Sequence, residues 1–190
     1  MVAIDNTTLA LLLHPKAKPP NDPATKLPLT KAQERIEHLI TDLDAESERI
    51  IIPTPVLSEF LILAAKDGQL YLEKIQAART LLIKPFDERA AIELAAMELS
   101  DRGRIGKKAG SEAPYQKVKY DRQIVAVAKV NGAHTIYSDD DDVRKFAEKA
   151  GLKVVSTWEL PVPPSKTPLL DILDDLPEQT LDPDEGKKKS

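Results

Sequence analysis

Acidic residues in four separate segments of this chain are of the type that binds divalent metal ions. They are Asp5, Glu59, Asp121 and the acids of the run Ser138–Asp142. Carboxylates that lie close together repel one another, and each raises the pKa of its neighbours. Mg²⁺ and Mn²⁺ prefer carboxylate and water oxygens, so binding such an ion relieves the repulsion. A metal held in this way lowers the pKa of a water molecule and stabilises both oxygens of an in-line phosphoryl displacement, which is the chemistry that these residues indicate.

The composition excludes several other kinds of site. The 190 residues include no cysteine, which rules out disulfides, thiolate zinc sites, iron–sulfur clusters and cysteine nucleophiles. The three histidines have no spacing that indicates a metal site. No basic, apolar leader follows Met1, and the longest apolar run, Phe60 to Ala65, is too short to cross a bilayer. We therefore expect a cytoplasmic protein without membrane association, of a size that suits one domain.

The elements that must position these acids alternate between strands and helices. Apolar and β-branched runs predict strands at 2–5, 49–53, 81–84, 134–137 and 152–155. Helical spacing and capping residues predict helices at 7–13, 31–45, 55–66, 69–80, 87–101, 120–130 and 142–150. This alternation indicates an α/β fold, with a parallel sheet covered by helices on both faces. Ligands of such sheets bind beyond the carboxyl ends of the strands, which is where Asp5 and the Ser138–Asp142 run are expected.

A basic stretch follows the helix predicted at 87–101. Residues 101–123 hold seven basic side chains against three acidic ones, a net charge of +4, within a chain of net charge −4. Such a segment attracts a polyanion if it lies beside the site, and a solvated surface segment is the other interpretation. Residues 103–117 are predicted to form a polar loop. In the helix before it, the residues expected to face inward are Ala91, Leu94, Ala95 and Leu99.

Four segments resemble the four motifs of PIN domains. They are Ile4-Asp5-Asn6-Thr7, Pro55-Val-Leu-Ser-Glu59-Phe, Asp121-Arg-Gln-Ile-Val-Ala-Val-Ala128 and Ile136-Tyr-Ser138-Asp-Asp140-Asp-Asp142. Each motif alone is weak, but all four occur in the right order on the expected elements, and the similarity covers residues 1 to about 158. Their order and spacing resemble the VapC toxin-like branch. The resemblance implies a three-layer α/β/α PIN-like fold with a mainly parallel central sheet, and an endoribonuclease that uses Mg²⁺ or Mn²⁺ to hydrolyse RNA phosphodiester bonds.

The resemblance also implies roles for single residues. It implies catalytic roles for Asp5, Glu59, Asp121 and Asp140, and metal binding by Asp5, Asp121 and Asp140. Thr7 and Ser138 match the hydroxyl residues that orient these acids, and Asp142 matches an additional acid. The four consecutive aspartates leave either Asp139 or Asp140 as the ligand. Asp140 is favoured because the family places this acid two residues after the hydroxyl.

RNA is the implied substrate, and the family also suggests an antitoxin-like protein and a second copy of the chain as partners. The residues expected to bind RNA phosphates are Lys107, Lys108, Lys117 and Lys119. Residues 1–160 are expected to form the PIN-like nuclease domain. Residues 161–190 are expected to form a flexible, proline-rich tail, which is acidic because it holds seven acids and four lysines. This tail and the loop predicted at 15–29 depart from a minimal toxin.

Other interpretations of the same residues remain open. Asp121 in isolation also suits a helix N-cap, and the four aspartates suit a solvated helix start favoured by the helix dipole. The whole chain also suits an RNA- or protein-binding regulatory module that keeps the PIN fold but has little or no nuclease activity. A Mg²⁺-dependent receiver domain shares the sheet and the acids, but it needs an aspartate where the strand Ile50-Ile-Ile-Pro53 ends in proline. The receiver domain is therefore the least favoured of these functions.

Overall fold

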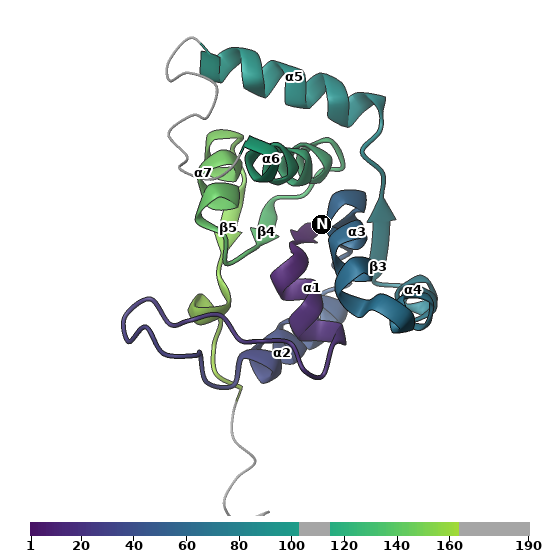
Figure 1. Ribbon diagram of the computed structural model, residues 1–190, viewed down its shortest axis with the longest axis vertical. Coiled ribbons are helices and arrows are strands. Elements are labelled where there is room, and N and C mark those ends of the chain that lie inside the picture. The colour runs from purple at the N-terminus through teal and green to yellow at the C-terminus, as the bar shows by residue number, and fades with distance from the viewer. Residues whose placement is uncertain (103–114, 164–190) are drawn as a thin grey trace, which may run out of the picture.

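A central sheet of five parallel strands organises the chain. The computed structural model describes residues 1–102 and 115–163 (Figure 1). The strands lie in the order β3-β2-β1-β4-β5, and every neighbouring pair is parallel. Their bounds are β1 Val2–Ile4, β2 Ile50–Pro53, β3 Leu81–Lys84, β4 Thr135–Tyr137 and β5 Lys153–Val155. The sheet confirms the predicted α/β class.

Helices cover both faces of the sheet, which gives the three predicted layers. One apolar core lies between the sheet and the first four helices, which are α1 (Asn6–Leu13), α2 (Ala32–Ala45), α3 (Thr54–Ala64) and α4 (Gly68–Ala77). The core of the opposite face includes residues of α6 (Tyr115–Val130) and α7 (Asp141–Lys149). The 3₁₀ helices η1 (Ala65–Asp67) and η2 (Thr157–Glu159) complete the described elements. None of the helices within these described residues is long and apolar enough to cross a membrane.

The second strand shows why the sheet forms where it does. Ile50, Ile51 and Ile52 have no exposed surface, and successive side chains enter the cores on opposite faces. A strand covered on both faces needs such a continuous apolar run. The strand ends at Pro53, and α3 begins at the next residue with Pro55 in its first turn. This abrupt change from strand to helix places Glu59 about one turn into α3, near the carboxyl edge of the sheet.

The register between β1 and β4 brings the first and the last motif together. Ala3 lies opposite Ile136, and Ile4 lies opposite Tyr137. The backbone N–H of Asp5 donates to the carbonyl oxygen of Tyr137 at 3.1 Å, so the pairing continues past the end of β1. Asp5 and Ser138 consequently leave the same edge of the sheet side by side.

The start of α6 differs from the prediction. The helix begins at Tyr115 instead of Tyr120, so Lys117 lies on the helix and not in a loop. Val118 has no exposed surface and lies in the same core as Val125, so the buried face of α6 begins before the predicted start of the helix. The rest of the predicted loop, with Lys107 and Lys108, lies outside the described residues. The same holds for the predicted tail beyond residue 163.

The inward face predicted for α5 (Glu88–Arg102) was wrong in part. Leu99 is 68% exposed, and Ala91 and Ala95 are exposed as well, whereas Ala90 and Met97 contribute to the core. The helix packs mainly against α6, and Figure 1 shows it at the top of the view, above α6. A helix that packs against another helix buries a narrower stripe of side chains than a helix that covers a sheet, so some apolar side chains of α5 remain exposed.

Candidate metal centre

Asp5 is fixed at the carboxyl end of β1 by hydrogen bonds to both of its carboxylate oxygens. Oδ1 accepts from the backbone N–H of Thr8 at 2.8 Å, which caps α1, and Oδ2 accepts from the hydroxyl of Ser138 at 2.6 Å. The residue is only 5% exposed, and burial raises the pKa of Asp5 to about 6 in spite of these hydrogen bonds. A desolvated carboxyl group of this kind is stabilised in its charged form by a nearby cation.

Ser138 connects Asp5 to Asp140. Its Oγ donates to Asp5 and also accepts from the backbone N–H of Asp140 at 3.1 Å. Asp140 in turn caps α7, because its Oδ1 accepts from the backbone N–H groups of Asp142 and Val143 at 2.8 and 3.3 Å. The helix-start interpretation of the aspartate run is therefore correct for Asp140. The cap uses Oδ1, which leaves Oδ2 of the same carboxylate for other partners.

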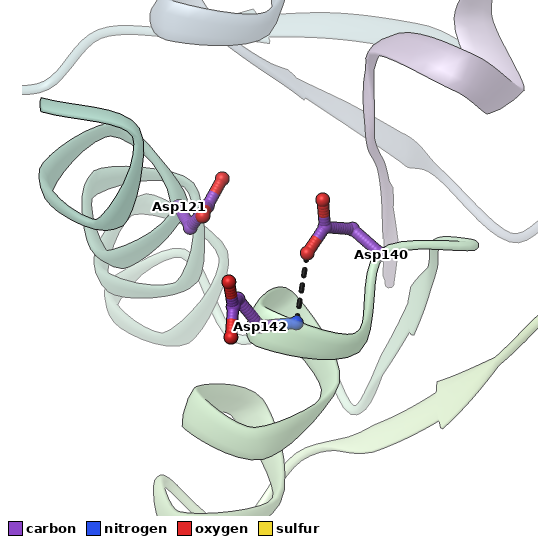
Figure 2. A group of neighbouring side chains, drawn as sticks. All are labelled: Asp121, Asp140 and Asp142. Carbon is purple, nitrogen blue, oxygen red and sulfur yellow. Dashed lines mark hydrogen bonds between the residues drawn. The ribbon is translucent and has the colours of Figure 1, made fainter. Parts of the chain in front are cut away.

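Asp121, Asp140 and Asp142 form a cluster of carboxylates. One oxygen of each lies within 4.8 Å of the other two. Figure 2 shows Asp121 on α6 facing Asp140, which precedes α7, and Asp142 in the first turn of α7. Asp121 is 7% exposed, and its Oδ2 is buried without a hydrogen-bond partner among the described residues. Because an unpaired buried carboxylate oxygen is costly, this arrangement suits a hard cation.

The acids of the cluster repel one another in the absence of a cation. Burial is the largest cause that raises the pKa of Asp121, to about 7, and the charges of Asp140, Asp142 and Glu59 add to it while Lys117 opposes it. Burial also raises the pKa of Glu59. The charge of Lys117 lowers this pKa, and the charge of Asp140 raises it. Glu59 therefore lies close enough to interact electrostatically with the cluster.

Lys117 places a positive charge against the cluster. Its Nζ lies 2.6 Å from Oδ2 of Asp140 and 4.0 Å from Oδ2 of Asp142. Burial alone would raise the pKa of Asp140, but the hydrogen bond and charge of Lys117, together with the helix cap, hold it below its ordinary value. The sequence suggested an RNA phosphate as the partner of Lys117, whereas the structure shows its ammonium group against the acids. Lys119 is exposed and forms no ion pair with a described residue.

The structure brings most of the predicted residues together. Glu59 and Lys117 lie beside the cluster, and Asp5 is joined to it through Ser138. Thr7 forms no side-chain hydrogen bond with a described residue. Thr8, which the sequence analysis missed, donates its backbone N–H to Asp5 and its hydroxyl to the carbonyl oxygen of Tyr137 at 3.1 Å. Its spacing was the available signal, because a capping aspartate accepts from the backbone N–H two or three residues later.

Asp139 faces a different partner from Asp140. Its Oδ1 accepts from the backbone N–H of Thr157 at 2.6 Å, and its Oδ2 accepts from the hydroxyl of Thr157 at 2.7 Å. Both oxygens therefore tie the end of β4 to η2. Asp139 therefore lies outside the carboxylate cluster that includes Asp140.

Asp139→Ala is accordingly expected to destabilise the fold without changing metal binding. The change leaves two donors of Thr157 without their acceptor, which costs about 1–3 kcal/mol. Thermal unfolding in EDTA and in Mn²⁺ measures the effect: the unfolding temperature should fall by the same amount in both. In Asp140→Ala, by contrast, the rise in unfolding temperature caused by Mn²⁺ should disappear. Loss of that rise in Asp139→Ala would make Asp139 a ligand instead.

Comparisons with known proteins identify the fold. Residues 29–149, more than half of the chain, match the PIN domain. The structure of VapBC2 from Rickettsia felis bound to a DNA fragment from its promoter is similar, with a TM-score of 0.52 and 16% identity over 82% of this chain and 98% of the other. The structure of DNA-bound VapBC from Salmonella typhimurium is also similar, with a TM-score of 0.51 and 17% identity over 83% of this chain and 99% of the other. No curated protein sequence matches the chain.

This chain belongs to the PIN domain family. The matched range includes Glu59, Asp121, Asp140 and Asp142 and begins after Asp5. The match confirms the resemblance to PIN domains and covers three of the four motifs, and the two VapBC structures share the fold.

Proposed function

We propose that this protein is an endoribonuclease that hydrolyses RNA phosphodiester bonds with the help of Mg²⁺ or Mn²⁺. The observation that carries the proposal is the convergence of Asp121, Asp140 and Asp142, which leaves a buried oxygen of Asp121 without a partner in the described part of the chain. A set of donors made only of carboxylate oxygens suits these two ions better than soft metals. Membership of the PIN domain family supports the same chemistry.

Asp121, Asp140 and Asp142 would hold the ion, with Asp5 and Glu59 as neighbouring acids. The sequence-based set had Asp5 in place of Asp142. We include Asp142 as the third direct ligand because one of its carboxylate oxygens lies within 4.8 Å of oxygens of Asp121 and Asp140. A bound Mg²⁺ or Mn²⁺ would lower the pKa of a water molecule and stabilise negative charge on the phosphate oxygens.

Residues around the acids hold them in position before an ion binds. Ser138 and Thr8 orient Asp5, and the first turn of α7 orients Asp140. The amino-terminal end of α7 also stabilises negative charge through the helix dipole. Supporting hydrogen bonds of this kind orient ligands and strengthen metal binding.

An antitoxin-like protein is the partner that we propose, with RNA as the substrate. The similar structures from R. felis and S. typhimurium are VapBC complexes, which supports a toxin–antitoxin role. A homodimer is a further proposal taken from the family. Ile62 on α3 is 79% exposed and Leu70 on the adjacent α4 is 52% exposed, which offers apolar surface for either partner.

Cleavage of a mixed panel of structured and unstructured RNAs tests the proposed activity. Wild-type protein, freed of co-purifying partners, should cleave in Mn²⁺ or Mg²⁺ and not in EDTA. Asp140→Asn should lower the rate by more than about 100-fold, because loss of even a supporting residue at a metal site costs roughly 10- to 100-fold. Asp141→Asn is the matched control, since this neighbouring aspartate is exposed and lies outside the cluster. Cleavage in EDTA, or equal losses in both variants, would contradict the proposal.

The second candidate function is an RNA- or protein-binding regulatory module with little or no nuclease activity. Lys117 favours it, because an ammonium group 2.6 Å from Asp140 already provides positive charge where a metal ion would bind. RNA binding by the folded wild-type protein, without cleavage in any of the metals, would support this function over the first.

A further inference from the structure

A cavity of about 400 Å³ lies beside α1, outside the acid cluster. Its polar lining comes from the first turn of α1 and from the segment that follows the helix, and Leu63 of α3 forms part of its wall. The polar residues are Asn6, Thr7, His14, Lys16 and Lys18. Asn6, Ala10 and His14 are spaced four residues apart and share one face of the helix. The cavity therefore follows that face along the length of α1, about 12 Å for eight residues.

One end of this cavity is formed by residues that directly follow Asp5 in the chain. Asn6 and Thr7 directly follow Asp5, which Ser138 connects to Asp140. Lys16 and Lys18 lie at the opposite end, after the last residue of α1. A ligand in the cavity would thus extend from the residues next to Asp5 towards two lysines.

The polar groups of the cavity mostly donate hydrogen bonds. They include an amide, a hydroxyl and two ammonium groups. Nδ1 of His14 accepts from the backbone N–H of Lys16 at 3.2 Å, so the neutral ring has its proton on Nε2 and donates from there. Among the residues that the structure describes, no acidic side chain lines the cavity. Neither Lys16 nor Lys18 forms an ion pair with residues 1–102 or 115–163. This environment suits an anion.

Two further features distinguish the cavity from a simple anion site. Oδ1 of Asn6, a residue that lines the cavity, is buried and has no hydrogen-bond partner in the described part of the chain, so an N–H group of a ligand that reached it would satisfy it. Ala10, Ala17 and the half-exposed Leu63 add apolar surface to the lining. The ligand that satisfies these features combines negative charge, N–H donors and a flat apolar face. A nucleotide has all three.

We propose that this cavity, the α1 pocket, binds one nucleotide of the RNA strand next to the phosphodiester that is cleaved. The assignment rests on the proposed function. Lys16 and Lys18 bind phosphate, Asn6 binds the edge of the base, and the face of the base packs against Leu63. Because a base must be unpaired to enter such a pocket, the α1 pocket selects single-stranded segments over duplexes.

Binding of a fluorescein-labelled, single-stranded RNA 12-mer of mixed sequence tests the α1 pocket. Fluorescence anisotropy in EDTA at low salt should show a Kd about tenfold or more higher for Lys16→Ala/Lys18→Ala than for the wild type, with a salt dependence reduced by roughly two phosphate contacts. Lys26→Ala/Lys31→Ala removes the same charge from the same connection between α1 and α2, outside the pocket. This control should change the Kd by less than about twofold, because it removes only long-range attraction. An equal loss of RNA affinity in the two double variants would overturn the assignment.

Two additional measurements separate the possible failures. One outcome is that Lys16→Ala/Lys18→Ala weakens RNA binding more than the control pair does while the wild type cleaves no RNA in any metal. That result would support the α1 pocket as an RNA site and contradict the proposed nuclease function. If the wild type cleaves RNA and both double lysine variants have the KM and Kd of the wild type, the nuclease function is supported and RNA binding by the α1 pocket is contradicted. An oligoglutamate peptide of equal charge should bind at least tenfold more weakly than the RNA. Equal affinity, lost equally in Lys16→Ala/Lys18→Ala, would assign the pocket to an acidic protein segment instead.

Discussion

Asp121→Asn is expected to stabilise the metal-free protein and, at the same time, to abolish metal-dependent cleavage. The pKa of Asp121 is about 7 in the folded protein against an ordinary value of 3.8. Between these pH values the folded state retains a proton that the unfolded chain has released, so stability falls as the pH rises towards 7. Asparagine does not titrate, so Asp121→Asn removes this pH-dependent loss of stability. The full shift, which already includes the charge of Lys117, corresponds to about 4 kcal/mol, and screening by water reduces the expected gain at pH 8 to about 1–2 kcal/mol.

Thermal unfolding in EDTA as a function of pH measures the first effect. At pH 8 the variant should unfold about 2–8 °C above the wild type, and the difference should disappear near pH 4. In Mn²⁺ the wild type should unfold at a higher temperature than the variant, because an ion present at a hundred times its Kd stabilises the wild type by about 2.7 kcal/mol. Cleavage should fall by more than about 100-fold. Asp141→Asn should show neither effect. A variant less stable than the wild type at pH 8 in EDTA would mean that the charged form of Asp121 is stabilised in the absence of metal.

Lys117→Met is expected to tighten metal binding. The ammonium group of Lys117 contacts Asp140 and lies near Asp142, so a cation that enters the cluster must displace it or tolerate its repulsion. Two like charges at 4 Å repel by about 4 kcal/mol at an effective dielectric constant of 20. The lysine side chain is about half exposed and can turn into solvent, which reduces the expected effect to a Kd about fivefold to tenfold lower. Isothermal titration with Mn²⁺ measures it.

Lys119→Met provides the matched control for this experiment. Lys119 lies on the same helix, is exposed and forms no ion pair with a described residue, so its loss should leave the Kd for Mn²⁺ unchanged. In EDTA, Lys117→Met should be less stable than the wild type by about 1 kcal/mol, because Asp140 loses its partner. Unchanged metal affinity in Lys117→Met would show that Lys117 leaves the cluster without cost. Cleavage by this variant alone would favour the regulatory function for the wild type.

The sheet and the general location of the site could be predicted because their signals are local. The isoleucines at 50–52 indicate a strand buried on both faces, whatever the rest of the chain does. Asp5 and the Ser138–Asp142 run each follow an apolar strand, and parallel strands bring such ends to one edge. The order of the motifs then identified the family. These inferences needed no knowledge of side-chain contacts.

The detailed arrangement of the acids could not be predicted because it depends on contacts between distant segments. Both oxygens of Asp5 are occupied, one of them by Ser138, and this follows from the register of β1 against β4. Asp139 turns away because Thr157 supplies its donors. The direction of Lys117 depends on where α6 begins, and the polar sequence before residue 118 gave no periodicity to locate that point.

The position of β1 in the middle of the sheet determines when the site can form during synthesis of the chain. This strand is made first, yet one of its two neighbours is β4, and Asp5 is held by a serine 133 residues further along the chain. A growing chain on the ribosome has β1, α1 and β2 long before it has β4 and α7. The acids of the cluster therefore cannot meet until the polypeptide has emerged past residue 142. An enzyme that attacks RNA would thus remain harmless to the message and ribosome that produce it until nearly the whole domain has been made.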